Sequence, residues 1–249
     1  MKEKKDLTNQ FFDLNKFPSQ EGIIFFGISM SKISNTQDAK SCFREVEHLV
    51  KKIVKPQVGL NIIYSDYLYF NSDEKASILK NKYLSLILSH KNNFLKILSK
   101  NPWYIQKSFS FLTWNQLLLE IKDWTSHLGE IKKIYAKDKN FQKYILEDLN
   151  SIGKKKMGEN EVNFFLEEIL LFYLIAKGKV KLHNEYVQGH EKWTLFCYPG
   201  KPLKSEIYLF QLNPFKLKNP KNKFENCYYD LEDKKLYDYS RVDLESFKC

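Results

Sequence analysis

The chain has 249 residues, a length that fits one substantial hydrophobic core, so we expect a single domain over residues 1–249. Apolar residues make up 43% of it and aromatic residues 15%, which is too apolar for a disordered chain. No segment approaches the roughly 18 to 20 consecutive apolar residues of a membrane span, and the N-terminal residues lack the apolar run of an export signal. We therefore expect a soluble globular protein.

Cysteine usage predicts a reducing cytoplasm and no structural metal. Four cysteines are too few for a disulfide scaffold in a chain of this length, and they are too widely spaced for a CxxC metal pair: Cys42, Cys197, Cys227 and Cys249.

The formal net charge of +10 is carried almost entirely by lysine, since Arg44 and Arg241 are the only arginines. A surplus of this size indicates either a solvated surface or a polyanionic partner. Lysine is a point charge without the bidentate fork of arginine, so it suits phosphate backbones better than the reading of bases.

The first half of the chain predicts alternating strands and helices. Residues 22–28 form an apolar run that ends in Gly-Ile-Ser, as in a fully buried strand of a parallel sheet. Residues 38–55 have helical spacing, and a second apolar strand begins at 58. This order is typical of a doubly wound α/β sheet.

A lysine-rich helix is predicted over 73–100. Its only acids, Asp73 and Glu74, lie in the first turn, so no later acid neutralises its lysines. A solvated helix face is the ordinary interpretation of such a charge run, but this imbalance favours a polyanion-binding face. The lysines are Lys75, Lys80, Lys82, Lys91, Lys96 and Lys100.

The second half is less regular. We expect a strand within 101–112, helices over 114–138, 140–157 and 158–178, strands within 192–203 and 205–212, a weakly patterned tail over 213–249 and an N-terminal extension over 1–20. The helix over 140–157 ends in a cluster of Lys154, Lys155 and Lys156.

Several catalytic motifs are absent. The sequence has no GxGxxG, GxxxxGK[ST], HExxH or GxSxG pattern, and its five histidines are dispersed. If Ser29 is a nucleophile, no histidine base is evident for it, which favours an activated ester as acyl donor. Aminoacyl-tRNA is such a donor, and it is also a polyanion.

The stretch FFGISMSKIS, which contains Ser29, resembles the nucleophile region of the tRNA-dependent cyclodipeptide synthase family. The lysine helix, the segment NFFLEEILLFYL with Glu168 and the segment LFCYPGKP with Tyr198 resemble further features of the family in the same order. The resemblance covers roughly 22–202. Lys32, three residues after Ser29, and the dipeptide Tyr198-Pro199 resemble the subfamily that has Tyr-Pro in its catalytic loop and no asparagine after the nucleophile.

The sequence departs from the family pattern in two places. Phe164 stands four residues before Glu168, where the family has a tyrosine; an alternative register places Tyr173 there. Glu168 and Tyr198 are also farther apart than is usual in the family, with 179–193 as the insertion.

The resemblance implies a Rossmann-like α/β domain similar to the catalytic domains of class I tyrosyl- and tryptophanyl-tRNA synthetases, with no nucleotide or metal cofactor. It implies two aminoacyl-tRNA substrates and a ping-pong reaction that yields a cyclic dipeptide. Ser29 would carry the aminoacyl group, Glu168 would hold or deprotonate the substrate ammonium, and Tyr198 would relay a proton. Phe25, Gly27 and other residues near the strand end would shape a hydrophobic pocket, with Phe164 as one wall.

Each of these residues also has an ordinary structural explanation. Ser29 can be a turn or N-cap serine, Glu168 a surface acid and Tyr198 a packed aromatic. At the level of the whole protein, the alternative is a noncatalytic tRNA- or RNA-binding module of the same fold. A serine hydrolase for small esters is disfavoured because neither its elbow motif nor a base is present.

Overall fold

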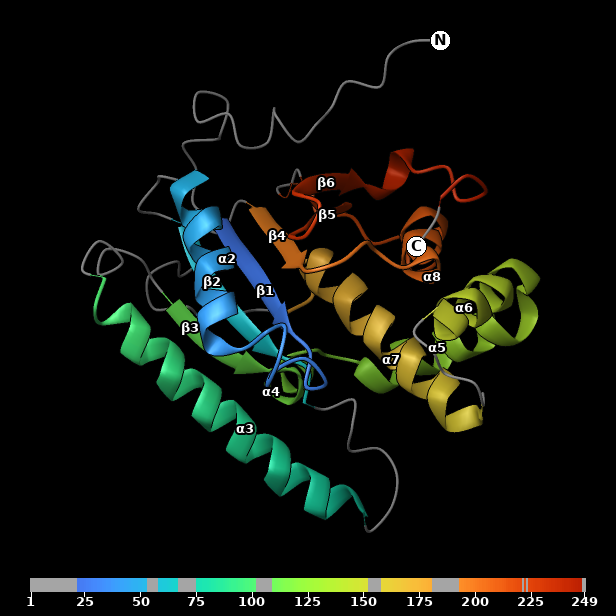
Figure 1. Cartoon of the computed structure of the whole chain (residues 1–249). Helices are drawn as coiled ribbons and strands as arrows, with labels where there is room; N and C mark the ends of the chain where they lie inside the picture. The colour runs from blue at the N-terminus through green and yellow to red at the C-terminus, as the bar shows by residue number, and fades with distance from the viewer. Residues whose placement is uncertain are drawn as a thin grey trace.

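The computed structural model describes residues 22–52, 58–66, 75–101, 109–151, 158–180, 193–220, 222 and 224–247. Its centre is a six-stranded sheet in the order β3-β2-β1-β4-β5-β6 (Figure 1). The first five strands in this order are parallel and β6 is antiparallel to β5. The strands are β1 (Gly22–Ile28), β2 (Val58–Tyr64), β3 (Phe109–Thr113), β4 (Trp193–Tyr198), β5 (Cys227–Asp230) and β6 (Lys235–Asp238). The predicted α/β class with a parallel-sheet core is confirmed.

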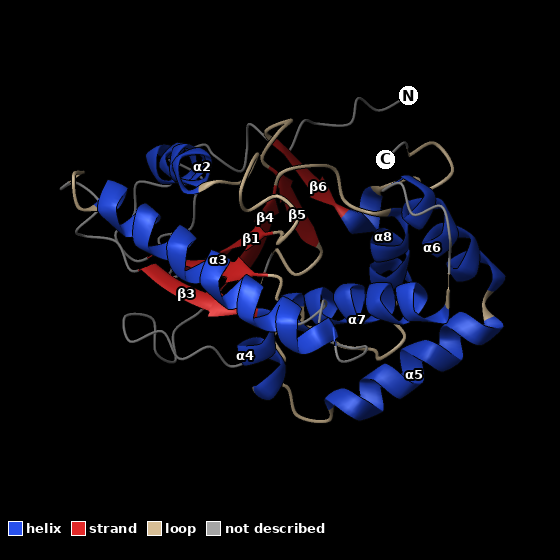
Figure 2. Cartoon of the chain, turned by 60° about the horizontal axis from the view of Figure 1, so that its bottom comes forward, coloured by secondary structure: helices blue, strands red, loops and turns tan. Residues whose placement is uncertain are grey.

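Helices flank both sides of this sheet. On one side lie α2 (Ala39–Lys52) and α3 (Lys75–Leu98), and on the other lie α5, α6, α7 and α8 (Figure 2). The short α4 (Trp114–Leu119) follows β3 directly, and a 3-10 turn, η3 (Tyr239–Arg241), follows β6. The second group has the bounds α5 (Trp124–Lys137), α6 (Lys139–Ser151), α7 (Glu159–Ala176) and α8 (Lys204–Leu212).

The central strand β1 separates two hydrophobic clusters. Because side chains alternate along a strand, Phe25 points to the cluster that contains α7 and α8, whereas Ile24 and Phe26 point to the cluster that contains α2 and α3. Every residue of β1 is buried. Burial on both faces explains why the sequence of this strand is continuously apolar rather than alternating.

The direction of α7 is shown by the contacts of Asn222. Its side-chain amide donates to the carbonyl of Ala176 at 3.4 Å and to the hydroxyl of Thr194 at 2.8 Å, and its oxygen accepts from the Thr194 N–H at 3.0 Å. The C-terminal end of α7 therefore lies beside the first residues of β4. The N-terminal half of α7 consequently lies toward the carboxyl ends of the parallel strands.

The predicted strand within 205–212 is wrong, because these residues belong to α8. The buried Asp148 of α6 accepts hydrogen bonds from the N–H groups of Lys204 and Ser205, at 3.1 and 2.8 Å. This carboxylate satisfies donors at the start of the helix from a position distant in sequence. A short apolar run fits either a strand or a helix, and here a tertiary contact decides between them.

Two other expectations need adjustment. The helix expected over 114–138 is two helices, α4 and α5, separated at Asp123, whose φ of 61° interrupts the helical backbone. The tail over 213–249, expected to be weakly patterned, supplies β5 and β6 to the sheet. The helix expected over 140–157 is described as far as Ser151.

Within the described residues, no helix combines the length and the apolar character needed to cross a membrane.

Candidate functional site

The strand order creates a switch point between β1 and β4. The chain proceeds from β1 to β2 and β3 on one side, and then returns to place β4 on the other side of β1. In doubly wound sheets, ligands bind at such a point, outside the carboxyl ends of the strands. Ser29 directly follows β1 and Tyr198 is the last residue of β4, so two of the three predicted catalytic residues lie at this position.

The loop after β1 is held by the side chain of Gln37. Its amide oxygen accepts from the Ser29 N–H at 2.8 Å, and its amide nitrogen donates to the carbonyl of Gly27 at 2.9 Å. The Ser29 hydroxyl lies 2.8 Å from the hydroxyl of Ser31. Ser29 itself is half-buried, so a fixed backbone presents a hydroxyl that is accessible to solvent.

Ser29 does not cap the helix that follows. Helix α2 begins at Ala39, and the carboxylate of Asp38 accepts from the Ser41 N–H at 2.7 Å. This hydrogen bond to the Ser41 backbone is the main reason why the pKa of Asp38 lies below its usual value. Asp38 is therefore the capping residue, and the N-cap explanation of Ser29 does not apply.

A buried histidine lies beneath the loop. His90 of α3 uses both ring nitrogens: Nε2 lies 3.1 Å from the carbonyl of Gln37, and Nδ1 lies 2.9 Å from the hydroxyl of Tyr64. A carbonyl oxygen can only accept, so Nε2 carries the proton and Nδ1 accepts from Tyr64. Because desolvation is the largest influence and lowers its pKa, His90 is neutral and structural, and it supplies no base to Ser29.

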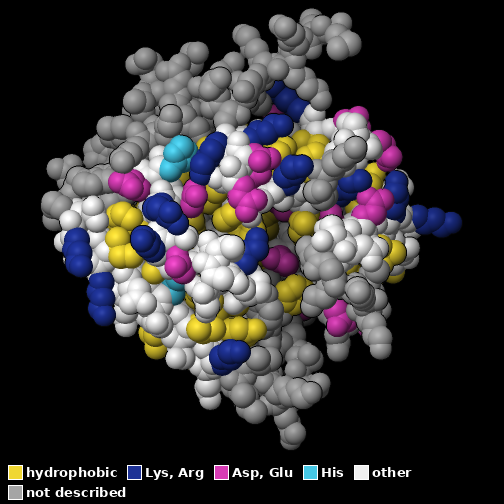
Figure 3. Space-filling view, viewed as in Figure 1, with side chains coloured by type: hydrophobic (Ala, Val, Ile, Leu, Met, Phe, Trp, Pro, Cys, Tyr) yellow, Lys and Arg dark blue, Asp and Glu magenta, His cyan; other side chains and the backbone are white. Residues whose placement is uncertain are grey.

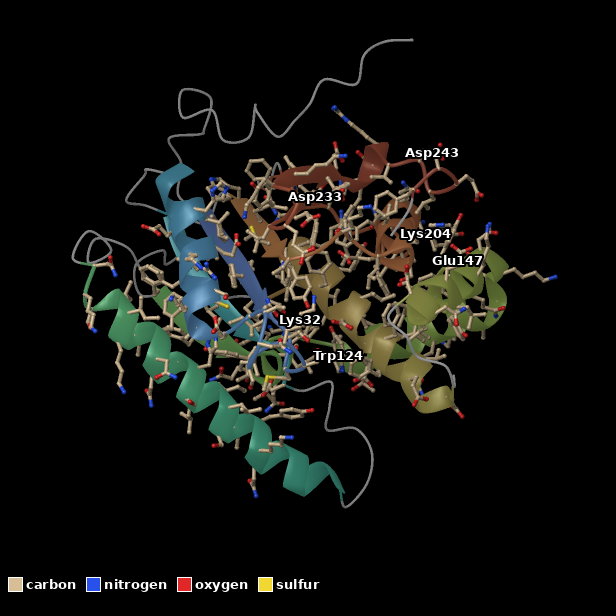
Figure 4. The ribbon with its side chains drawn as sticks, viewed as in Figure 1. Lys32, Trp124, Glu147, Lys204, Asp233 and Asp243 are labelled. Carbon is tan, nitrogen blue, oxygen red and sulfur yellow. The ribbon has the colours of Figure 1, made fainter. Side chains whose placement is uncertain are left out.

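Tyr198, at the end of β4, lies beside the loop that follows β1. The ammonium nitrogen of Lys32 lies 5.1 Å from the centre of the Tyr198 ring, and Figure 4 shows Lys32 beside the carboxyl end of β1. A Cβ on Gly27 would lie 3.1 Å from Cδ2 of Tyr198 and 3.2 Å from Cε1 of Phe196. The missing side chain at Gly27 therefore lets both rings lie against β1. The buried Phe25 stacks on Phe196, with their ring centres 6.4 Å apart.

The backbone after Tyr198 is anchored to β5. The hydroxyl of Tyr228 lies 2.7 Å from the carbonyl oxygen of Gly200 and 3.2 Å from that of Tyr198. The Gly200 N–H donates to the buried carboxylate of Asp230 at 3.0 Å, and its φ of 116° is one that favours glycine. The half-buried Pro199 is thus fixed between two anchored residues.

Glu168 lies on α7 above this end of the sheet. The ring of Phe172, one helical turn later, lies 4.4 Å from the ring of Phe196, which precedes Tyr198 by two residues. One helical turn advances about 5.4 Å and two strand residues about 6.6 Å, so the direction of α7 brings Glu168 to the level of Tyr198. Phe164, one further turn toward the N-terminus, is partly buried against the same cluster.

The Glu168 carboxyl is desolvated. Burial raises its pKa to about 7, although the residue as a whole is only half-buried. No described residue donates a hydrogen bond to it. A carboxyl in this condition can bind an ammonium group or accept its proton near neutral pH.

The alternative register of the sequence places Tyr173 elsewhere. Its hydroxyl donates to the amide oxygen of Asn213, and the buried Lys177 donates to Asn226 at 2.6 Å. Both residues lie toward the C-terminal end of α7, beside the start of β4. They are therefore remote from the carboxyl ends of the strands, where Ser29 lies.

The predicted lysine face lies on the other side of the sheet. Lys82, Lys96 and Lys100 are exposed on or just after α3, and Lys91 is half-buried with its ammonium 5.2 Å from the centre of the Phe111 ring. The side chains of Lys75 and Lys80 are not described, and Lys154, Lys155 and Lys156 lie outside the described residues. Figure 3 shows Lys and Arg side chains among apolar ones along the edge formed by α3.

The structure thus brings together four of the predicted site residues: Gly27, Ser29, Lys32 and Tyr198. It places Glu168 and Phe164 on the helix above them. The lysine face is separate from all of these residues. Sequence reasoning did not single out Ser31, Gln37 or Tyr228. The Ser-x-Ser spacing is a local signal for Ser31, whereas the other two act through contacts distant in sequence. Among the described residues, no group of three or more His, Cys, Asp or Glu side chains is arranged to hold a metal ion.

No family model matches this sequence, and no curated protein sequence matches it. In fold, the chain is similar to a cyclodipeptide synthase (CDPS) from Fluoribacter dumoffii, with a TM-score of 0.55 and 11% identity over 84% of this chain and 89% of that one. A CDPS from Staphylococcus haemolyticus gives a TM-score of 0.54 and 13% identity over 81% and 87% of the two chains. A cyclodipeptide synthase from Bacillus thermoamylovorans gives 0.52 and 14% over 86% and 89%. At these identities the likeness concerns the fold alone, and the chain therefore has the fold of cyclodipeptide synthases.

Proposed function

We propose that the protein is a tRNA-dependent cyclodipeptide synthase of the subfamily with Tyr-Pro in the catalytic loop. The observation that carries the proposal is the arrangement at the switch point: Ser29 directly follows β1, Tyr198 ends the adjacent parallel strand β4, and the desolvated Glu168 lies on the helix above them. The similarity of fold to cyclodipeptide synthases supports it.

In the first step, the Ser29 hydroxyl attacks the ester carbonyl of one aminoacyl-tRNA. A bond forms between Oγ and the carbonyl carbon, the bond to the tRNA 3′ oxygen breaks, and that oxygen takes up the serine proton. The product is an aminoacyl-enzyme. The donor is already an activated ester, so this step requires no histidine base, which agrees with the occupied nitrogens of His90.

In the second step, the amino group of the aminoacyl-enzyme attacks the ester of a second aminoacyl-tRNA. An ammonium must first lose its proton, and the Glu168 carboxylate takes that proton because its raised pKa lies near the working pH. A bond forms between this nitrogen and the second carbonyl carbon, the bond to the 3′ oxygen of the second tRNA breaks, and that oxygen takes up a proton from the attacking nitrogen. The resulting dipeptidyl-enzyme retains one free amino group. This group attacks the Ser29 ester and forms the ring, while Tyr198 passes a proton to the departing Ser29 oxygen.

In this proposal, the substrate side chain would be received by apolar residues near Gly27. Phe25 and Phe196, which stack on each other, would support it from below, and Phe164 would border it from α7. Lys32 and Pro199, next to Tyr198, would border the entrance. We expect this pocket to prefer a hydrophobic side chain. The lysines of α3, together with Lys154, Lys155 and Lys156, would bind the tRNA backbone in the cytoplasm.

Expression of the protein in bacteria, followed by mass spectrometry of the medium, tests the proposal. We expect a diketopiperazine from the wild type and none from Ser29→Ala, whose fold is checked by circular dichroism. Incubation with labelled aminoacyl-tRNA should leave a covalent adduct on the wild-type protein that is absent from the variant.

Ser31→Ala is the matched control, because its hydroxyl lies within hydrogen-bond distance of Ser29. Peptide mapping should place the adduct on Ser29 in this control. An adduct that persists in Ser29→Ala removes that serine from the mechanism. Salt-sensitive binding of tRNA by a folded protein that never consumes aminoacyl-tRNA contradicts the synthase and favours the RNA-binding module.

A further inference from the structure

A second buried carboxyl lies beside Glu168. Glu206 belongs to the first turn of α8 and is only 8% exposed. Its carboxyl group accepts from the hydroxyl of the fully buried Tyr239 and from the N–H of Leu203. Neither the sequence pattern nor the proposed mechanism assigns it a role.

The packing of α7 and α8 places the two acids at the same level. The rings of Phe172 on α7 and Phe210 on α8 have centres 5.6 Å apart. Glu168 and Glu206 each precede their phenylalanine by one helical turn. Both helices run back from the carboxyl ends of the strands, since Asn222 ties the end of α7 to the start of β4 and α8 follows the end of β4. The two carboxyls therefore each lie one helical turn from this ring pair, toward the carboxyl ends of the strands.

Titratable groups on several packed elements face Glu206. Burial is the largest influence and raises the pKa of Glu206 to about 8; the hydrogen bond from Tyr239 lowers it, and the negative charge of Glu168 raises it. Asp148 of α6 raises it further and faces the start of α8, where it accepts from Lys204 and Ser205. Tyr228 of β5 senses the charge of Glu206.

No described lysine or arginine compensates either acid. Lys204, at the start of α8, pairs instead with Glu147 of α6, at 2.8 Å. The two labelled residues lie next to each other in Figure 4. Two carboxyls that share a buried site without a cation cannot both ionise easily, so the ionisation of one opposes that of the other.

We infer that Glu168 and Glu206 form one acid pair, which takes a single ammonium group of the substrate and in which Glu206, held by Tyr239, is the positioning residue. The inference rests on the proposed function for the identity of the ammonium group. When the substrate ammonium gives its proton to the Glu168 carboxylate, the amine becomes neutral and the carboxyl becomes protonated, so the charge on the pair changes by one. Glu206 keeps its own proton in this step and stays neutral beside Glu168.

The pair is tested by titrating the free protein, labelled with carbon-13 at the glutamate side-chain carboxyls, by NMR. Glu206→Gln and Glu168→Gln each leave one raised titration. In a coupled pair, the second carboxyl to lose its proton does so beside the negative charge of the first, which moves its titration to higher pH. We therefore expect the upper wild-type step to lie about one pH unit above the titration of either single variant.

Glu130→Gln, on the exposed side of α5, is the matched control and should leave both steps unchanged. Tyr239→Phe removes a donor to Glu206 and should raise the upper step further. Glu206→Gln retains an oxygen that accepts from Tyr239 and Leu203, so it should remain folded.

If the two titration midpoints of the wild type equal those of the two single variants, the acid pair is overturned, whether or not the protein forms a cyclic dipeptide. Coupled titrations in a protein that forms no cyclic dipeptide overturn the proposed function and leave the pair intact. In an active protein, the kcat/KM profile of Glu206→Gln should lose the upper step, whereas a purely structural role would lower activity equally at every pH.

Discussion

Gln37 shows how one side chain can fix the backbone around a candidate nucleophile. It bonds the backbone on both sides of Ile28, at the Gly27 carbonyl and the Ser29 N–H, while its own carbonyl lies against His90 of α3. Ser29 was identified from the resemblance of its flanking residues to a known motif. Gln37 has no such signal, because a glutamine in a loop gives no indication of which backbone groups it will bond.

Gln37→Leu should lower the free energy of unfolding by about 1–3 kcal/mol, because it leaves the Gly27 carbonyl and the Ser29 N–H without their partner. It should reduce acyl-enzyme formation at protein concentrations and temperatures where the variant is fully folded. Urea unfolding and the labelled-adduct assay measure the two effects.

Gln37→Glu separates the two bonds, since it keeps an acceptor for Ser29 and loses the donor to Gly27. Thr36→Ala, at the exposed neighbouring position, is the control and should change stability by less than about 0.5 kcal/mol. A Gln37→Leu protein that acylates at the wild-type rate would show that the loop does not depend on this amide.

At the scale of elements, the sequence predicts well those segments whose own pattern decides their structure. β1 and β2 follow from short continuous apolar runs, α2 and α3 follow from helical spacing, and their order alone indicates the parallel sheet. Helix α8 and strands β5 and β6 were not predicted, because their structure depends on contacts with residues far away in the chain, such as Asp148 with the start of α8. The position of Glu168 likewise depends on how α7 packs against distant elements, and the contact of its last residue, Ala176, with Asn222 shows this packing.

Asp148→Ala should destabilise the protein by about 2 kcal/mol, because two N–H groups at the start of α8 lose a buried acceptor. Asp148→Asn keeps one oxygen and should cost less. Thermal or urea unfolding measures the ranking of the wild type, the asparagine variant and the alanine variant. Equal stability of all three would show that α8 is held by its apolar contacts alone.

For the molecule as a whole, the net charge of +10 is distributed unevenly. Residues 75–101 include no acid, and the exposed lysines of this segment lie on the opposite side of the sheet from α7 and α8. A tRNA bound along α3 would therefore have to carry its aminoacyl end around the carboxyl edge of the sheet to reach Ser29.

Replacement of Lys82, Lys96 and Lys100 by glutamine should weaken tRNA binding and flatten its dependence on salt. Each lost phosphate contact should reduce the slope of log affinity against log salt by about 0.7–0.9. Filter binding or fluorescence anisotropy over a salt series gives this slope.

Replacement of Lys122, Lys137 and Lys139, which are exposed around α5, changes the net charge equally and serves as the control. An equal loss of affinity in both triple variants would show that tRNA senses the overall charge rather than the α3 face.

The pairing of β1 with β4 also has a consequence for how the site is assembled. Gly22 pairs with Trp193 in this ladder, whereas β1 and β2 meet across a much shorter stretch of chain. Long loops are costly to close, so contacts of this sequence separation tend to form slowly. Ser29 and Tyr198 reach the same edge of the sheet only through the pairing of β1 with β4, so we expect the gain of activity during refolding to follow the slowest kinetic phase rather than the pairing of β1 with β2.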